Sequence, residues 1–187
     1  EMMSEISVQS DESEILPSEN VLDLKVSNIE FDQAKVNEVM RSKDALASQV
    51  QTFITLDFYD HDTKYTDPQN SYAPQFDTIF SFKNTVDEFY LKYFESNHVL
   101  VEVFTIKIQG EKSSQKIGEA KFPLATVLKN DRSFQSQEVR CAIAGQEGLV
   151  IGKIFYRSRM RKSLEEAQKW YKKKVDVKEK KGDDFMK

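Results

Sequence analysis

Hydrophobic and polar residues alternate along several short stretches of the chain, and a two-residue period is typical of half-buried β-strands. The central example is a pair of stretches, residues 98–104 and 117–122, which are rich in Val, Ile and Phe and flank a polar loop. This arrangement predicts two antiparallel strands joined by the loop. Within the pair we expect Leu100 and Phe122 to be deeply buried.

Five further stretches show strand character and predict layers around the central pair. Residues 21–31 would direct Leu22, Leu24 and Val26 to one face of a strand. Residues 50–59 alternate in the same way. The remaining stretches are residues 77–82, 136–143 and 149–156, with Gly145 and Gly148 in the turn between the last two.

The hydrophobic period changes to that of a helix in two places. Residues 86–94 place aromatic side chains four positions apart, which predicts a short connecting helix with an aromatic face. Near the C-terminus, Ser163 and Glu166 form a capping box that begins an amphipathic helix running to about Val175. Its apolar stripe consists of Leu164, Ala167, Trp170 and Tyr171. The charged residues beyond this helix, 176–187, are expected to fray.

Several short strands with one connecting helix, and without a repeating strand–helix rhythm, favour an all-β fold, an antiparallel β-sandwich. The chain of 187 residues is long enough for one domain with appendages. We expect an acidic, disordered or extended arm at residues 1–20 and the sandwich at residues 21–157. A basic C-terminal helix and tail would occupy residues 158–187.

The net charge of −4 is unevenly distributed along the chain. Residues 1–20 contain six acids and no Lys or Arg, whereas residues 157–187 contain twelve Lys or Arg and six acids. The overall charge gives no general attraction to nucleic acid or to an anionic membrane, but the basic C-terminal part suggests a tail that meets partners. The predicted partner-binding residues are Arg157, Arg159, Arg161, Lys162, Trp170, Tyr171, Lys172, Lys173 and Lys174. Two roles remain open for Trp170 and Tyr171: packing against their own sandwich, or anchoring in a partner.

Residue types that support catalysis are scarce. His61 and His98 are the only histidines, and neither lies in a motif that offers a nucleophile or a triad. The single cysteine, Cys141, excludes an intramolecular disulfide and fits a reducing compartment, so we expect a cytoplasmic protein. The basic residues near the C-terminus are not accompanied by an RNA-binding motif. Catalytic residues, cofactors and nucleic-acid binding are therefore not predicted.

Several motifs, taken in order, resemble those of a C2 domain. Tyr72-Ala-Pro-Gln-Phe76 followed by Phe80-Ser-Phe82 is similar to the family's Asn-Pro-x-Trp…Phe-x-Phe segment. Residues 101–104 and 117–122 resemble its Val-Glu-Val-x and Ile-Gly-x-x-x-Phe strands. Residues 152–156 resemble its Gly-x-Leu strand, and their place at the end of the sandwich implies the circularly permuted variant called type II.

Within this class, the chain is more closely similar to a C2 domain of the retinitis pigmentosa GTPase regulator-interacting protein family. The similarity is carried by residues 58–60, 87–93, 99–103 and 164–173. That family belongs to cilia, where its C2 domains serve as protein-interaction modules. The resemblance therefore implies a scaffold of the cilium, in the axoneme or in the basal body and transition zone.

Many C2 domains bind calcium through aspartates in two loops at one end, and the resemblance identifies the corresponding positions. In the second loop these positions lack acids: they are Thr105, Lys107 and Gln115. The first loop, residues 32–49, keeps three acids: Asp32, Glu38 and Asp44. Carboxylates from one loop make a weak site. The sequence Asp60-His61-Asp62, beside Lys64, would lie at the opposite end, and we interpret it as a solvated turn. A metal site is therefore not predicted.

Some calcium-independent C2 domains hold phosphoinositides on a lysine-rich strand. The matching strand here carries Thr52, Thr55 and Asp57, which disfavours membrane binding through the sandwich.

We therefore predict a non-catalytic, calcium-independent C2 domain that acts as a protein-interaction or structural module in a ciliary assembly. Its partners would be other ciliary or axonemal proteins, such as acidic coiled coils or tubulin, that complement the basic tail. Two alternatives remain: a peripheral membrane module that uses this tail, and an accessory subunit of an axonemal enzyme complex.

Overall fold

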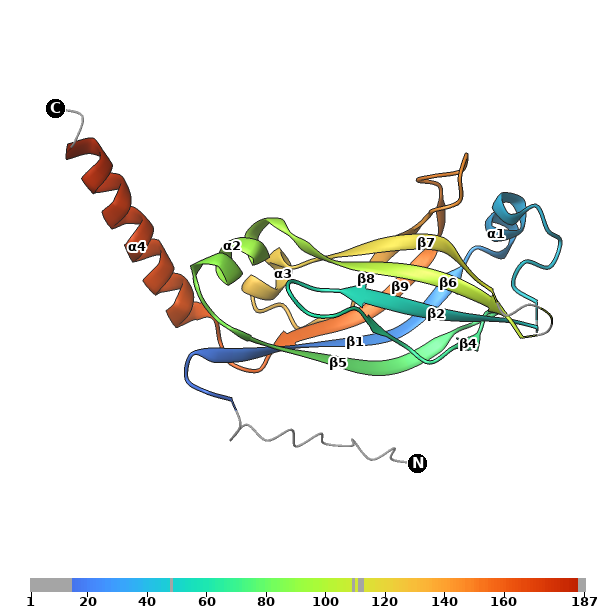
Figure 1. Cartoon of the computed structure of the whole chain (residues 1–187), viewed down its shortest axis with the longest axis horizontal. Helices are drawn as coiled ribbons and strands as arrows, with labels where there is room; N and C mark the ends of the chain where they lie inside the picture. The colour runs from blue at the N-terminus through green and yellow to red at the C-terminus, as the bar shows by residue number, and fades with distance from the viewer. Residues whose placement is uncertain (1–14, 48, 109, 111–112, 185–187) are drawn as a thin grey trace.

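The structure, a computed structural model, describes residues 15–47, 49–108, 110 and 113–184 (Figure 1). The expected acidic arm therefore lies mostly outside the described residues. In the described part the chain forms nine strands and four helices. In chain order they are β1 (Glu19–Phe31), α1 (Gln33–Met40), β2 (Val50–Asp57), β3 (Lys64–Tyr65), β4 (Gln69–Asn70), β5 (Gln75–Thr85), α2 (Glu88–Ser96), β6 (His98–Lys107), β7 (Ser114–Pro123), α3 (Ala125–Leu128), β8 (Gln135–Cys141), β9 (Val150–Met160) and α4 (Glu165–Asp184).

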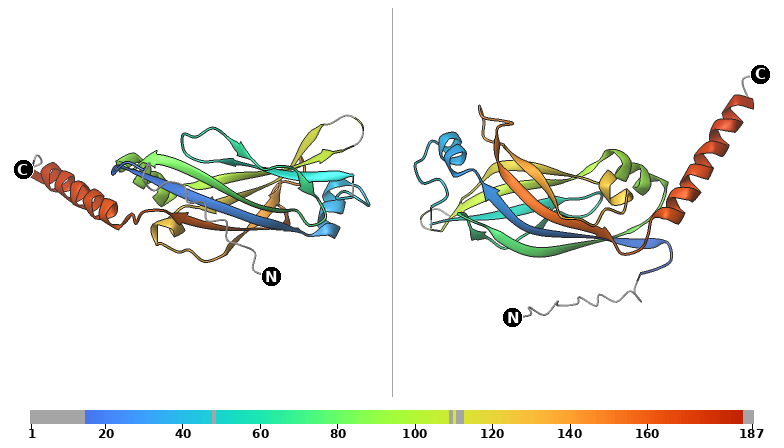
Figure 2. Two further views of the ribbon diagram at one scale, coloured as in Figure 1. Left: turned by 90° about the horizontal axis from the view of Figure 1, so that it is seen from below. Right: turned by 180° about the vertical axis from the view of Figure 1, so that it is seen from behind.

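The strands form an antiparallel sandwich, as the sequence predicts. Their hydrogen-bonded order is β3-β2-β6-β7-β8-β9-β1-β5, with β4 attached to β2. Pairing between β7 and β8 is limited to Gly118 opposite Cys141 and Glu119 opposite Arg140. The sheet folds over at this seam into two layers, one containing β2, β6 and β7 and the other containing β8, β9, β1 and β5 (Figure 2). The last strand, β9, lies between β8 and β1, which is the type II topology.

The core fills the space between the two layers. Phe122 of β7 and Tyr156 of β9 stack across it with ring centroids 3.6 Å apart. The predicted inward faces of β1 and β2 are confirmed, because their apolar residues are buried: Leu22, Leu24, Val26, Ile54 and Leu56. Gly145 and Gly148 both adopt positive φ, 84°, in the β8–β9 turn, a conformation that favours glycine.

One prediction about the central pair is wrong. Phe122 is buried, but Leu100 is only half-buried, because the inward side chains of β6 are those of Val99, Val101 and Val103. The start of this strand is apolar at three consecutive positions, so alternation alone gives no choice between its two faces. Leu100 belongs to the outer face, with Phe104.

Helix α2 closes the end of the sandwich from which α4 departs (Figure 1). Asp87 caps it, because its carboxylate accepts a hydrogen bond from the Tyr90 backbone N–H at 2.9 Å. Tyr90 and Phe94 are buried against Phe58, whereas Phe89 is exposed.

The turn at residues 60–62 was expected to be solvated, and this expectation is wrong for His61. Its ring is half-buried, lies 5.2 Å from the ring of Phe82, and shares a hydrogen bond of 2.7 Å with Asn84 Oδ1. The side chain of Asn84 also donates to Asp60 Oδ1 at 3.0 Å. This turn is therefore fixed to β5 by polar contacts.

The elements at the two ends of the sandwich differ from the expected boundaries. β1 begins at Glu19 and β9 ends at Met160, so the expected boundaries after residues 20 and 157 fall inside strands. Helix α4 extends to Asp184, through residues expected to fray, because Lys and Glu favour helix and the segment contains no proline. Among the described residues, no helix combines the length and hydropathy that a membrane span requires.

Candidate functional site

The first group of predicted partner-binding residues lies on strand β9 and directly after its end, rather than in a tail. Arg157, Arg159 and Arg161 occupy alternate positions, and the intervening Ser158 and Met160 are buried in the core. The three arginines therefore project from the outer face of the layer formed by β8, β9, β1 and β5. The Arg-x-Arg-x-Arg alternation in the sequence was the signal that could have extended this strand beyond residue 156.

A buried carboxylate organises the arginines. Asp23 of β1 lies opposite Arg159 in the strand register and is only 5% exposed. Its Oδ2 accepts hydrogen bonds from the Nε atoms of Arg159 and Arg161, both at 3.0 Å. Its Oδ1 accepts from Arg161 Nη2 at 3.1 Å and from Ser81 Oγ at 2.6 Å. These charge-assisted bonds fix both guanidinium groups against the sheet.

Two opposing effects act on the pKa of Asp23. Burial alone would raise it, but the hydrogen bonds from Arg161 and Ser81 and the positive charge of Arg161 outweigh burial and lower the pKa below 3.8. The carboxylate therefore stays ionised at neutral pH. Two guanidinium groups share this one negative charge, so the cluster remains positive.

The other predicted cations of this segment have different surroundings. Arg157 is exposed; its Nε donates to the Arg132 carbonyl at 2.9 Å, and its guanidinium carbon lies 4.6 Å from the ring centroid of Phe134. The ammonium of Lys162 donates to the carbonyls of Leu16 and Glu19, at 2.9 and 3.3 Å. Lys162 therefore fixes the start of β1.

Helix α4 carries the second group of predicted residues, which are Trp170, Tyr171 and the lysines 172–174. Some of them face the sandwich and others face solvent. Leu164 is buried, and Ala167 and Tyr171 pack against the core. Trp170 is 52% exposed, with the ammonium of Lys174 at 4.8 Å from its ring centroid. The two roles considered for the aromatic pair are thus split: Tyr171 packs on its own domain, whereas Trp170 is available to solvent.

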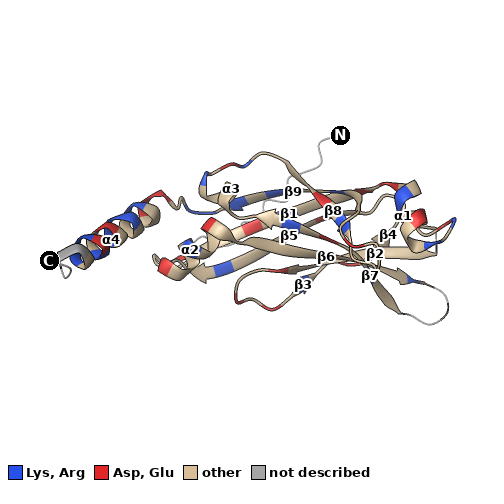
Figure 3. Cartoon of the chain, turned by 90° about the horizontal axis from the view of Figure 1, so that it is seen from above, with Lys and Arg blue, Asp and Glu red and all other residues tan. Residues whose placement is uncertain are grey.

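Ion pairs between α4 and α2 support this placement. Glu88 of α2 accepts hydrogen bonds from Lys174 and Lys178 at 2.9 and 3.1 Å. These bonds lower the pKa of Glu88 below its ordinary value. Lys172 and Lys173 are exposed, and basic and acidic side chains both occur along the projecting helix (Figure 3).

The positions that correspond to calcium ligands hold other structural roles. Thr105 is buried, and Asp32 caps α1 by accepting from the Lys35 backbone N–H at 3.1 Å. Glu38 pairs with the Lys35 ammonium at 3.5 Å. Across the described residues, His, Cys, Asp and Glu side chains do not gather in groups of three or more that could hold a metal ion.

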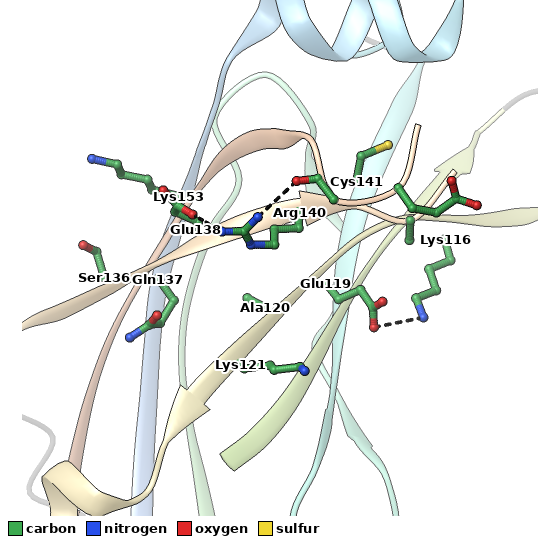
Figure 4. A pocket seen from close by; sticks show the side chains of 13 residues that line it. Lys116, Glu119, Ala120, Lys121, Ser136, Gln137, Glu138, Arg140, Cys141 and Lys153 are labelled. Atoms are coloured by element: carbon green, nitrogen blue, oxygen red, sulfur yellow. Dashed lines mark hydrogen bonds and ion pairs between the residues drawn. The ribbon is translucent and has the colours of Figure 1, made fainter. Parts of the chain in front are cut away.

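An open hollow of about 670 Å³ lies at the seam between β7 and β8 (Figure 4). Two pairs of the charges around it interact: Lys116 with Glu119 at 3.4 Å, and Arg140 with Glu138 at 2.8 Å. Lys116 also reaches Glu102 at 2.7 Å. These pairs lie within β7, within β8 or between β6 and β7, so they do not bridge the seam. Cys141 is buried in the wall of the hollow.

Comparison with known proteins agrees with this architecture. A family model described as the first C2 domain of RPGR-interacting protein 1 matches residues 12–163. The search among curated proteins returned no match. A solved structure of CC2D1B is 17% identical with a TM-score of 0.54; it covers 77% of this chain, which spans only 55% of that chain. A C2 domain of plant Extended Synaptotagmin 1 is 13% identical, with a TM-score of 0.47, covering 75% of this chain and 93% of its own.

Proposed function

Because the chain belongs to the C2 family represented by the first C2 domain of RPGR-interacting protein 1, we propose that it is a calcium-independent protein-interaction module of a ciliary assembly. C2 domains are generally non-catalytic, and we extend this property to the present chain. The interaction role is supported above all by helix α4, which carries the exposed Trp170. It packs on the sandwich through Tyr171 and on α2 through Lys174 and Lys178, and the rest of the helix projects away from the domain (Figure 1).

The exposed side of α4 has the composition of a docking surface. Trp170 and Val177 are each 52% exposed and lie seven residues apart, which places them on the same side of the helix. Lys173 and Lys181 are exposed and lie within about 60° of this line at 3.6 residues per turn. An exposed aromatic residue among cations suits an acidic partner surface, such as a coiled coil or tubulin.

Substitution of Trp170 tests this proposal. Trp170→Ala should leave the melting temperature unchanged, because the ring makes little contact with the core, and should release the full-length chain from detergent-extracted cilia. Truncation of an interface anchor costs about 2 kcal/mol or more, equivalent to a roughly 30-fold weaker complex. The bound fraction would be measured with a tagged protein in ciliated cells.

Tyr171→Ala is the matched control on the neighbouring, packed side. It should lower the melting temperature, since Tyr171 contacts the core. Normal retention of the Trp170→Ala protein in cilia would rule out α4 as the docking element. Release of the natural protein from the extracted cilia by vesicles of anionic lipid, but not by added salt, would support the membrane alternative.

Calcium should have no effect on stability. A ligand that binds only the native state raises the melting temperature, but Thr105, Lys107 and Gln115 cannot supply carboxylates. We expect equal melting temperatures in millimolar calcium and in chelator. A clear increase that Asp32→Asn abolishes would overturn the proposed calcium independence, and the same scan on Lys107→Asp would show whether the position can be converted toward a site.

A further inference from the structure

A row of four side chains crosses the outer face of the layer that contains β9. Lys25 of β1 lies opposite Arg157 of β9 on one side and opposite Ile79 of β5 on the other. Phe134 stands beyond Arg157, in contact with its guanidinium group. The row therefore reads Phe134, Arg157, Lys25 and Ile79: two cations between two apolar side chains. Both apolar residues are exposed, Phe134 by 67% and Ile79 by 50%.

Charge on this face is concentrated around the row. Arg159 and Arg161 lie beside it, joined by the single carboxylate of Asp23. The exposed Asp77 is the other acid close to Ile79 in the chain. Four cations therefore face two acids here. Farther along β9 the charges balance, because Lys153 lies opposite Glu30 and Glu138.

We propose that this row binds an extended segment of a partner protein with the pattern apolar–x–acid–x–apolar. Neighbouring strands lie about 4.8 Å apart, so Phe134 and Ile79 are separated by about 14 Å. Four residues of an extended peptide span nearly the same length, and its first, third and fifth side chains point to one side. A peptide that crosses the strands would place apolar side chains on Phe134 and Ile79. Its central carboxylate would lie between Arg157 and Lys25.

The chemistry of the row favours a protein segment over a lipid surface. An exposed aromatic ring and an exposed aliphatic side chain at the ends of the row supply contacts that a carboxylate alone would not use. Beyond the row and its two neighbouring arginines, this face is not strongly basic. Lys153, for example, lies opposite the acids Glu30 and Glu138. The inference adds to the proposed interaction role a partner pattern on a surface separate from α4, so failure here would leave the Trp170 experiment unaffected.

A pair of synthetic peptides tests the proposal. The probe contains Leu-Ser-Asp-Ser-Leu, and its control contains the same residues in the order Leu-Leu-Ser-Asp-Ser. In NMR titrations of the full chain, the probe should shift the backbone amide signals of Lys25, Ile79 and Arg157. The control should bind at least about tenfold more weakly, which corresponds to about 1.4 kcal/mol.

Charge reversal distinguishes this surface from α4. Lys25→Glu should weaken binding of the probe by at least about tenfold while leaving the melting temperature unchanged, because Lys25 is exposed. Lys172→Glu, an equal change of charge on α4, should leave probe binding unaltered. Equal binding of the two peptides, or equal losses in the two variants, would overturn the proposal. Binding to phosphatidylserine vesicles through Lys25 without any response to the probe would also overturn it and would assign the face to lipid.

Discussion

Replacing Phe122 by Ala is expected to lower the free energy of unfolding by about 3–5 kcal/mol. The ring is 1% exposed and stacks on Tyr156 of the opposite layer. Its removal would take away this contact and leave a cavity between the two layers. Small domains are stable by only about 5–15 kcal/mol, so a large part of the total would be lost. Chemical denaturation followed by circular dichroism would measure the change.

Leu100→Ala is the matched control, because Leu100 comes from the paired strand but faces outward and is only half-buried. We expect a loss of about 1 kcal/mol, as is common for single substitutions. Equal losses at Phe122 and Leu100 would contradict the assignment of the inner face of this strand pair.

Replacing Asp23 by Ala is expected to cost about 3 kcal/mol, because it leaves the largely buried guanidinium of Arg161 without its counter-charge. Arg159→Ala should cost less than about 1 kcal/mol, since its side chain is 56% exposed and solvent screens the pair. Both would be measured by denaturation at neutral pH. A larger loss for Arg159→Ala would show that the exposed arginine holds the cluster together.

The same carboxylate predicts a pH dependence. The pKa of Asp23 is lowered in the folded state, so its contribution to stability is fully present above the unfolded value of 3.8. That contribution is lost as the pH falls through the folded pKa. The difference in the free energy of unfolding between the natural protein and the Asp23→Asn variant should therefore become smaller as the pH falls below 3.8. A difference that widened in acid would contradict the proposed ionisation.

Local sequence patterns were sufficient for the main strands and for the positions of α2 and α4, because each depends on residues close together in the chain. The type II order came from the resemblance to C2 domains. The predicted capping box differs in detail, because Ser163 Oγ accepts from the Glu165 backbone N–H at 3.3 Å and α4 begins at Glu165. The alternation of residues 21–26 marks the inner face of β1 directly. Residues 99–101 are all apolar, and there the inner face is decided by the turn out of α2 and by the register with β2. This information is not local, which explains the error at Leu100.

The row on the outer sheet could not be predicted for a related reason. Its members come from four separate parts of the chain and meet only through the pairing of β9 with β1 and of β1 with β5. The arginines of residues 157–161 were recognised as basic, but Asp23, Lys25 and Phe134 were not singled out. Their roles depend on strand register, which residue types alone do not specify.

The placement of β9 beside β1 also determines how the domain responds to a pulling force. The first residues of β1 lie next to the last residues of β9, with Leu22 opposite Met160. Tension applied at Glu19 and Met160 would separate two antiparallel neighbours from their shared end. The hydrogen bonds between them would then break one after another, as in a zipper, instead of sharing the load in shear. The Lys162 bonds to Leu16 and Glu19 would be among the first to carry that load. A domain with this geometry yields early under tension applied at the shared end of β1 and β9.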